Sequence, residues 1–295
     1  MVNYGVTTST KIKLSLCTIV KAKMIDKNRK KILTVISLGA GVQSSTMAIM
    51  AAKGVLPKVD CAIFADTGYE PKAVYIYLKF LTEILPYPVH IVQKGNIKED
   101  MLAARGTTNF VVAPFFTQET ITGKKGMIRR QCTNDYKIQP IKKKIRELCS
   151  VGFNKRFPKD KYVEQWIGIS KDEISRMKPA RDPYILNRHP LIEANMSRQD
   201  CINYLKKENI PLPEKSACII CPFHSDKYWD FMKKERPSEF ADAVELDKEI
   251  RTISKNKNIK NYTHRSCKPL DEVEFVKEDN QLNMFNNECE GMCGV

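Results

Sequence analysis

The stretch from Ile32 to Ala52 constrains the fold of this chain more than any other. Leu33 to Ser37 is a short apolar run with β-branched residues, which is the composition of a buried parallel strand. A loop of small residues follows from Gly39 to Ser45, and Thr46 to Lys53 is an Ala- and Met-rich stretch that predicts a helix. This order brings backbone N–H groups and a helix N-terminus to one point, where they bind phosphate. The sequence therefore predicts a phosphate site at this turn.

The loop matches neither of two common phosphate-binding patterns. It has no Gly-Lys-Ser/Thr after the glycines, and it does not have the six-residue dinucleotide fingerprint. Gly39 and Gly41 nevertheless allow a close approach of the main chain to an anion, and Ser44 and Ser45 add hydroxyl donors. The alternative is an ordinary tight turn between a strand and a helix.

Two further apolar runs predict strands beside the first. Val59 to Ala65 and Val89 to Val92 are separated by Ala73 to Leu85, which has helical periodicity. This succession predicts a doubly wound, Rossmann-like parallel sheet with right-handed crossovers. Open sheets of this kind bind ligands at the carboxyl ends of their strands, so we expect Asp66, Thr67 and Gly68 to lie beside the phosphate loop.

The rest of the chain divides into recognisable segments. We predict a basic N-terminal extension at 1–31, a nucleotide-binding α/β domain at 32–190, and a smaller, mostly helical region with a mobile tail at 191–295. Ser197 is expected to cap a helix from Arg198 to Glu208. The remaining expectations are helices at 96–104, 137–148, 228–234 and 240–254, a strand at 162–169 and a loop at 106–126.

Net charge and hydropathy limit the kinds of partner and the compartment that we expect for this chain. The formal net charge of +15 favours a polyanionic partner such as a nucleic acid, although a solvated lysine-rich surface explains it equally. No run is long enough to span a membrane, and residues 14–20 are too short and interrupted for a secretory signal, so we expect a cytoplasmic protein. The basic clusters expected to contact nucleic acid are 124–125 with 129–130, 142–144 and 255–260.

Ten cysteines in a reducing compartment indicate metal, cluster or thiol chemistry rather than disulfides. Cys218 and Cys221 form a C-x-x-C, a spacing that suits zinc, an iron–sulfur cluster or a redox dithiol. Cys132 ends a region expected to face the same crevice. A closed zinc site would need a fourth ligand, for which His224, Cys289 and Cys293 are available. We interpret Cys17, Cys61, Cys149 and Cys201 as small buried apolar residues, and Cys267 stays open.

Cys289 and Cys293 lie in a short, polar, glycine-containing tail. Such a tail is not expected to pack as core and can swing, so one of these thiols is a candidate nucleophile that reaches into the nucleotide crevice. The alternative is a chain end with incidental cysteines.

Together these motifs resemble the phosphoadenosine phosphosulfate (PAPS) reductase family, in particular its phage and bacterial branch, within the PP-loop or adenine nucleotide alpha-hydrolase superfamily. The resemblance runs from Ile32 to Val295. The family's loop, Ser-Gly-Gly-x-Asp-Ser, is matched in frame by Gly39 to Ser44, and its Asp-Thr-Gly-Tyr by Asp66 to Tyr69. Arg176 matches the arginine that faces the sulfonucleotide. The resemblance thus implies an adenine nucleotide alpha-hydrolase type of sheet, with nucleotide contacts from Ser37, Gly39, Ala40, Gly41, Gln43, Ser44, Ser45, Asp66, Thr67 and Gly68.

The resemblance also implies a 4Fe-4S cluster. Cys132 with Lys137 is similar to the Cys-Cys-x-x-x-Lys element of cluster-binding reductases, and Cys218 with Cys221 is similar to their second cysteine pair. Glu288-Cys289 resembles the tail that carries the reductase nucleophile.

Departures from the family bear on the reaction. Gln43 stands in place of the loop Asp, which weakens a role for Mg²⁺ there, and Gln131 replaces the first of the paired cysteines. The three remaining cysteines, Cys132, Cys218 and Cys221, resemble instead the ligand set of PP-loop tRNA thiolation enzymes.

The sequence therefore supports an enzyme that binds ATP or PAPS and performs sulfur chemistry. In the ATP form, Arg176 neutralises developing charge while Cys289 or Cys293 relays sulfur, with a nucleic acid as the expected acceptor. In the alternative form, a sulfonucleotide reductase releases sulfite after reduction by a thioredoxin-like partner. A second alternative is a non-catalytic module stabilised by zinc.

Overall fold

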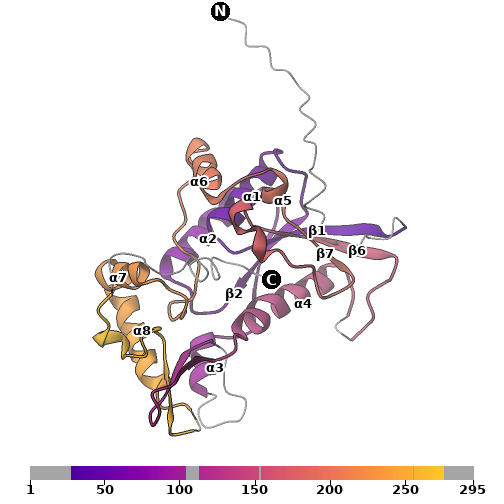
Figure 1. Ribbon diagram of the computed structural model, residues 1–295. Helices are drawn as coiled ribbons and strands as arrows, with labels where there is room; N and C mark the ends of the chain where they lie inside the picture. The colour runs from indigo at the N-terminus through magenta and orange to yellow at the C-terminus, as the bar shows by residue number, and fades with distance from the viewer. Residues whose placement is uncertain (1–27, 104–112, 153, 255, 276–295) are drawn as a thin grey trace, which may run out of the picture.

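The computed structural model describes residues 28–103, 113–152, 154–254 and 256–275. Its centre is a five-stranded sheet in the order β3-β2-β1-β6-β7 (Figure 1). Strand β1 (Lys30–Leu38) lies in the middle, between β2 (Cys61–Asp66) and β6 (Lys161–Ile167). Strands β3 (Val89–Gln93) and β7 (Ile185–Arg188) form the edges. All four strand pairs are parallel, which confirms the predicted doubly wound α/β sheet.

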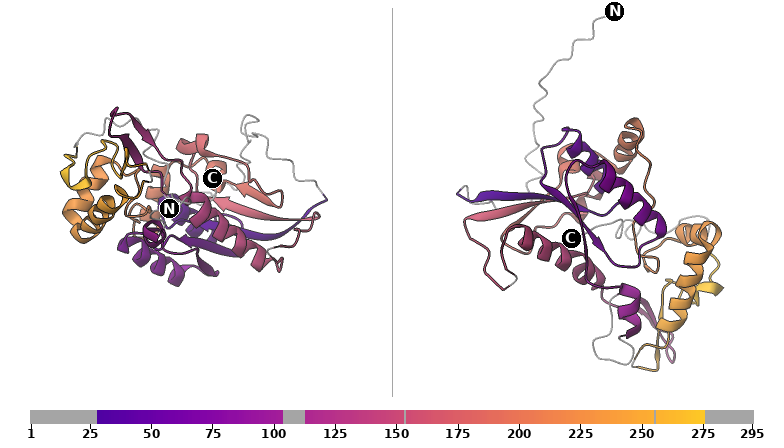
Figure 2. Two further views of the ribbon diagram at one scale, coloured as in Figure 1. Left: turned by 90° about the horizontal axis from the view of Figure 1, so that it is seen from below. Right: turned by 180° about the vertical axis from the view of Figure 1, so that it is seen from behind.

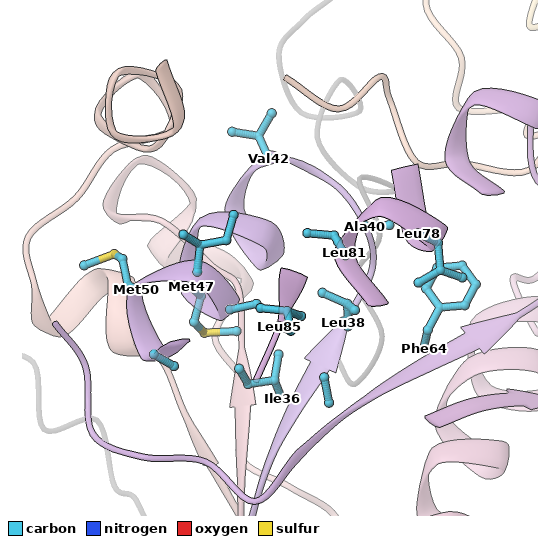
Figure 3. Packing of buried hydrophobic residues seen from close by; sticks show 14 of the residues in the cluster. Ile36, Leu38, Ala40, Val42, Met47, Met50, Phe64, Leu78, Leu81 and Leu85 are labelled. Atoms are coloured by element: carbon cyan, nitrogen blue, oxygen red, sulfur yellow. The ribbon is translucent and has the colours of Figure 1, made fainter. Parts of the chain in front are cut away.

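Helices cover both faces of this sheet (Figure 2). Helices α1 (Val42–Ala52), α2 (Lys72–Ile84) and α6 (Arg198–Lys207) pack on one face, and α4 (Gln139–Leu148) packs on the other. Because neighbouring side chains of a strand point to opposite faces, a strand covered on both sides is apolar throughout. In β1, Ile36 and Leu38 face α1 and α2, as Figure 3 shows, whereas Val35 faces α4.

A second group of elements lies to one side of the sheet (Figure 1). It contains α3 (Ile97–Ala103), α7 (Asp226–Glu235), α8 (Pro237–Ile250) and an antiparallel sheet in the order β5-β4-β8. Strands β4 and β5 span Phe116–Glu119 and Lys125–Met127, and β8 spans Ile259–Tyr262. Phe115, Trp229 and Leu246 are fully buried at the centre of this group.

The described residues also form four short helical elements. They are the π-helix η2 (Thr133–Ile138), the 3-10 turns η3 (Lys171–Arg176) and η4 (Leu270–Glu272), and α5 (Pro190–Glu193). A π-helical turn is uncommon and often marks a functional site.

The small antiparallel sheet was not predicted. Residues 106–126 were expected to form a loop, but they contain β4 and β5, and the C-terminal region contributes β8 as well as helices. The edge strand β7 was also missed. β4 is only half-buried and pairs with β8, about 140 residues away, so neither strand carries a strong local pattern.

The predicted cap at Ser197 is confirmed. Its hydroxyl accepts the Asp200 N–H, and the Asp200 carboxylate accepts the Ser197 N–H in return. Helix α6, which follows the proposed domain boundary at residue 190, packs on α1, and the division into domains stays a prediction. Within the described ranges no helix is both long enough and apolar enough to cross a bilayer.

Candidate functional site

The turn after β1 is tightly closed on itself. The Gly39 N–H donates to Ser44 Oγ at 3.2 Å, and the Ser44 hydroxyl donates to the Gly41 carbonyl at 3.3 Å. Ala40 has a φ of 55°, a left-handed conformation that costs a non-glycine residue roughly 1–2 kcal/mol. Gly41 begins α1 without a side-chain cap, so the first N–H groups of this helix favour an anion.

Strand β6 ends against this turn. A Cβ atom on Gly168 would lie 2.8 Å from the backbone nitrogen of Ser44, so only glycine fits there. Ser37, the last-but-one residue of β1, is buried, and its Oγ accepts a 2.6 Å hydrogen bond from Gln165 Nε2; its contact with a nucleotide stays a prediction. Ser45 lies buried in the first turn of α1.

Gln43 connects the turn to Arg176. The Gln43 amide donates to Glu173 Oε2 at 3.3 Å, and Arg176 Nη1 donates to Glu173 Oε1 at 2.6 Å. The other terminal nitrogen of Arg176, together with Ser170 Oγ, is buried with no hydrogen-bond partner among the described residues. Buried polar atoms are rarely left unpaired, so each of these two atoms could accept a polar ligand as its partner.

Asp66 ends β2, and Thr67 and Gly68 follow it, as predicted; their contacts with a nucleotide stay predictions. The Asp66 carboxylate accepts hydrogen bonds from the Gly68 N–H at 2.7 Å and from the Tyr75 hydroxyl at 2.8 Å, and so shapes the turn. Thr67 is buried, and its Oγ1 lies 3.2 Å from Cys218 Sγ. Thr67 therefore faces a thiol.

The structure brings together the three cysteines predicted as ligands. Cys132, Cys218 and Cys221 line one small pocket of about 30 Å³, together with Thr67 and Lys137. Burial, and next the nearby Glu70 carboxylate, raise the pKa of the Cys218 thiol well above its usual value. Cys218 is therefore protonated at neutral pH.

Glu70 is a residue of this pocket that the sequence did not reveal. Its side chain is buried, with Oε1 3.5 Å from Lys137 Nζ and 3.6 Å from Cys218 Sγ. Thr67 also donates to Glu70 Oε1 at 3.1 Å. One carboxylate two residues after Asp-Thr-Gly is too common a pattern to identify this role.

The segment that carries the C-x-x-C is bonded to both turns. The Ser216 hydroxyl donates to the Gly39 carbonyl, and the Ile219 N–H donates to the Tyr69 carbonyl at 3.0 Å. Together with the contact between Cys218 and Thr67, these bonds connect the segment of the thiol pocket to the turn after β1 and to the turn after β2.

The three cysteines of the pocket are of a type that binds metals, but their side chains are not positioned to hold one. Three thiols in one pocket offer the ligands that zinc and iron–sulfur clusters use. Within the described ranges, however, no three His, Cys, Asp or Glu side chains are positioned to hold a metal ion. His224 Nε2 lies 3.0 Å from the Cys218 carbonyl, and burial keeps the pKa of this ring well below its usual value. As placed, these residues do not fit a cluster or a zinc ion, which both stay predictions.

The other cysteines divide as follows. Cys61 and Cys201 are buried in apolar clusters, and burial raises the pKa of each thiol to about 12. Cys149 is half-buried and Cys267 is buried. The predicted nucleophiles Cys289 and Cys293, together with Cys17, lie outside the described residues.

The fold and site define an α/β protein with a tight strand-to-helix turn and a group of thiols near the carboxyl ends of its parallel strands. No protein-family model and no curated protein matches the sequence. Among solved structures, the chain is similar to a PAPS reductase from Candida auris in complex with phosphate, at 15% identity and a TM-score of 0.39, over 67% of this chain and 80% of that one. It is also similar to the U34-tRNA thiolase NcsA from Methanococcus maripaludis with its [4Fe-4S] cluster, at 13% identity and a TM-score of 0.33, over 91% of this chain and 83% of that one. These values are too low to transfer a residue or an activity.

Proposed function

We propose that the chain is an enzyme that binds an adenosine nucleotide at the carboxyl ends of β1 and β2 and uses it in sulfur chemistry. The observation that carries this proposal is the 3.2 Å contact between Thr67 Oγ1, at the edge of the nucleotide crevice, and the Cys218 thiol. A nucleotide bound at the turn would have its reactive end beside a group of thiols.

The polar atoms around the crevice support nucleotide binding. The uncapped start of α1 and the backbone N–H groups after Gly39 suit the phosphates. Arg176 Nη2 and Ser170 Oγ are buried donors that lack a partner in the described part of the chain, and a phosphate oxygen would satisfy both. Gln43 acts through Glu173 as a positioning residue for Arg176.

With ATP as the nucleotide, the reaction is an adenylation. An oxygen of the acceptor attacks the α-phosphorus, the bond to the β-phosphate oxygen breaks, and pyrophosphate leaves with the charge that Arg176 helps to neutralise. A sulfur nucleophile then displaces AMP from the activated acceptor. Binding and orientation of the phosphates are the steps assigned to the described residues.

One observation favours a sulfonucleotide as the alternative. The side chain of Gln43 is an amide committed to Glu173, so the turn offers no carboxylate for a magnesium ion at the position where the family has Asp. A thiolate would attack the sulfur of PAPS, the sulfur–oxygen bond to the nucleotide would break, and a second thiol would release sulfite as a disulfide forms.

The test compares the two nucleotides directly. Full-length protein, purified anaerobically, is assayed for ATP conversion to AMP and pyrophosphate and for sulfite release from PAPS with dithiothreitol, each beside a binding measurement. AMP formation supports the ATP form, and sulfite release supports the reductase form. Binding of neither nucleotide would refute the proposal.

A matched pair of variants tests the contact between Thr67 and Cys218. Thr67→Val keeps the shape of the side chain and removes the hydroxyl that contacts Cys218, so we expect turnover to fall about 10-fold or more with little change in nucleotide affinity. Thr82→Val alters an exposed threonine of α2 and should leave turnover unchanged. Equal effects of the two variants would contradict the assignment of Thr67.

A further inference from the structure

The opposite end of the parallel sheet holds a pocket of about 450 Å³. Its residues come from the segments that precede β1, β6 and β7, and from the end of α4. The seven-residue strand β6 separates the two ends of the sheet by about 20 Å. The pocket therefore cannot share a ligand of nucleotide size with the candidate site at the carboxyl ends.

Positive charge is concentrated around this pocket. Five of its nine lining residues are basic, and none of the nine is acidic: the basic ones are Arg29, Arg146, Lys155, Arg156 and Lys159. Two lysines of α4 have carboxylate partners, since Lys142 pairs with Asp182 and Lys144 with Glu147. The lining of the pocket is thus a place where basic side chains gather with no acidic side chain among them.

Two arginines of the pocket are held by neutral groups. Arg29 donates to the Pro183 carbonyl at 2.9 Å and to the Lys161 carbonyl at 2.7 Å. Arg146 donates to the Gly152 carbonyl at 2.7 Å and also to the Lys155 carbonyl. Carbonyl acceptors fix the direction of a guanidinium without cancelling its charge, so both positive charges remain at defined positions.

The remaining basic residues are available to a ligand. Lys155, Arg156 and Lys159 are exposed, and none of them forms a salt bridge with another described residue. They lie in one short segment before β6, so their charges are close together. Phosphate groups on a chain, spaced a few ångströms apart, match such a row of charges.

The two aromatic residues of the pocket, Phe157 and Tyr184, offer no surface on which a base could stack. The Phe157 and Tyr184 rings stack with centroids 4.2 Å apart, and Arg146 covers Tyr184 at 5.7 Å. Both rings are nearly buried, so neither offers a free face on which a base could stack. Contacts are then limited to charge on phosphate, which carries no sequence information.

We propose that this cation-lined pocket binds the phosphate backbone of a nucleic acid without sequence preference. The proposal does not depend on the reaction performed at the carboxyl ends of the strands. It places the nucleic-acid contact before β1, β6 and β7, rather than at the lysine clusters that stand out in the sequence.

The test measures binding of a fluorescein-labelled 20-nucleotide single-stranded RNA to the full-length protein between 50 and 200 mM salt. A triple variant with Lys155→Gln, Arg156→Gln and Lys159→Gln loses up to three phosphate contacts. The slope of log K against log salt should then decrease by about 2, and affinity at low salt should fall about 10-fold or more. The matched control removes three exposed lysines that do not line the pocket, with Lys58→Gln in the loop before β2, Lys79→Gln in α2 and Lys207→Gln in α6, and should change affinity less than about 2-fold.

Three outcomes would overturn the proposal. Equal weakening by the two triple variants would show diffuse attraction to net charge. Displacement of the RNA by tripolyphosphate at an equal concentration of charge would identify a small-anion pocket instead. In the wild-type protein, absence of protection from hydrogen exchange at 155–159 on RNA addition would place the contact elsewhere. This last measurement needs no variant and so does not depend on whether the triple variant folds.

Discussion

The close contact between Gly168 and the turn after β1 makes a sharp prediction for Gly168→Ala. The added Cβ would lie 2.8 Å from Ser44 N, 2.9 Å from Ser44 Cα and 3.2 Å from the Gln43 carbonyl carbon. All three atoms belong to the backbone, so no side-chain rotation can make room. The shortest contact is about 0.6 Å below the 3.4 Å at which ordinary contacts begin.

That overlap has two measurable costs. Overpacking of this size destabilises a protein by about 1–3 kcal/mol, which corresponds to a fall in Tm of roughly 5 °C for a chain of this length. The atoms that must move form the start of α1, which would bind the phosphates. We therefore expect nucleotide affinity to fall at least about 10-fold, equivalent to about 1.4 kcal/mol.

Thermal unfolding and calorimetric titration with ATP and PAPS measure the two costs separately. Gly152→Ala is the matched control, because its Cβ would meet only Lys155 Cγ at 3.4 Å, which is an ordinary contact with an exposed, flexible side chain. The control should change stability by less than about 1 kcal/mol and leave affinity unchanged. If Gly168→Ala retained both the Tm and the affinity of the wild type, the described closure of β6 on the turn would be wrong.

Three further changes test other parts of the structure. Glu173→Gln should destabilise the protein by about 3 kcal/mol in urea unfolding, because Arg176 would lose its buried carboxylate partner, and an unchanged midpoint would contradict the pairing. Ser216→Ala should lower the free energy of unfolding by about 1–2 kcal/mol, since the buried Gly39 carbonyl would lose its hydroxyl donor. Differential scanning calorimetry would show this as a lower Tm, and an unchanged Tm would contradict the hydrogen bond between Ser216 and Gly39. Burial lowers the pKa of His189 to about 4. The free energy of unfolding should therefore lose nothing to this group above about pH 6.5 and should decrease as the pH drops toward 4, because only the unfolded chain then binds a proton on the ring. His189→Gln should abolish about 3 kcal/mol of that pH dependence, and parallel pH profiles for wild type and variant would exclude this role.

Local patterns in the sequence determined the parallel sheet and the turn after β1. The apolar runs of β1 and β2 are buried, the half-buried run of β3 lies at the edge, and helices separate all three, so composition and order alone predict their parallel pairing. The small residues from Gly39 to Ser44 indicated a close-approach turn for a similar reason, because backbone conformation there depends on the residues themselves. The C-x-x-C at Cys218 likewise indicated that two thiols lie close together.

Other features depend on contacts between distant segments, and only the tertiary structure decided them. β4 and β8 acquire their strand conformation from each other across about 140 residues, and weak local preference cannot anticipate such a pairing. Glu70 and Lys137 become a buried pair beside Cys218 only when three separate segments meet. The basic pocket before β6 is likewise assembled from four segments, none of which is the most basic stretch of the chain. Burial and charge balance are properties of the packed molecule, and a sequence read in order does not contain them directly.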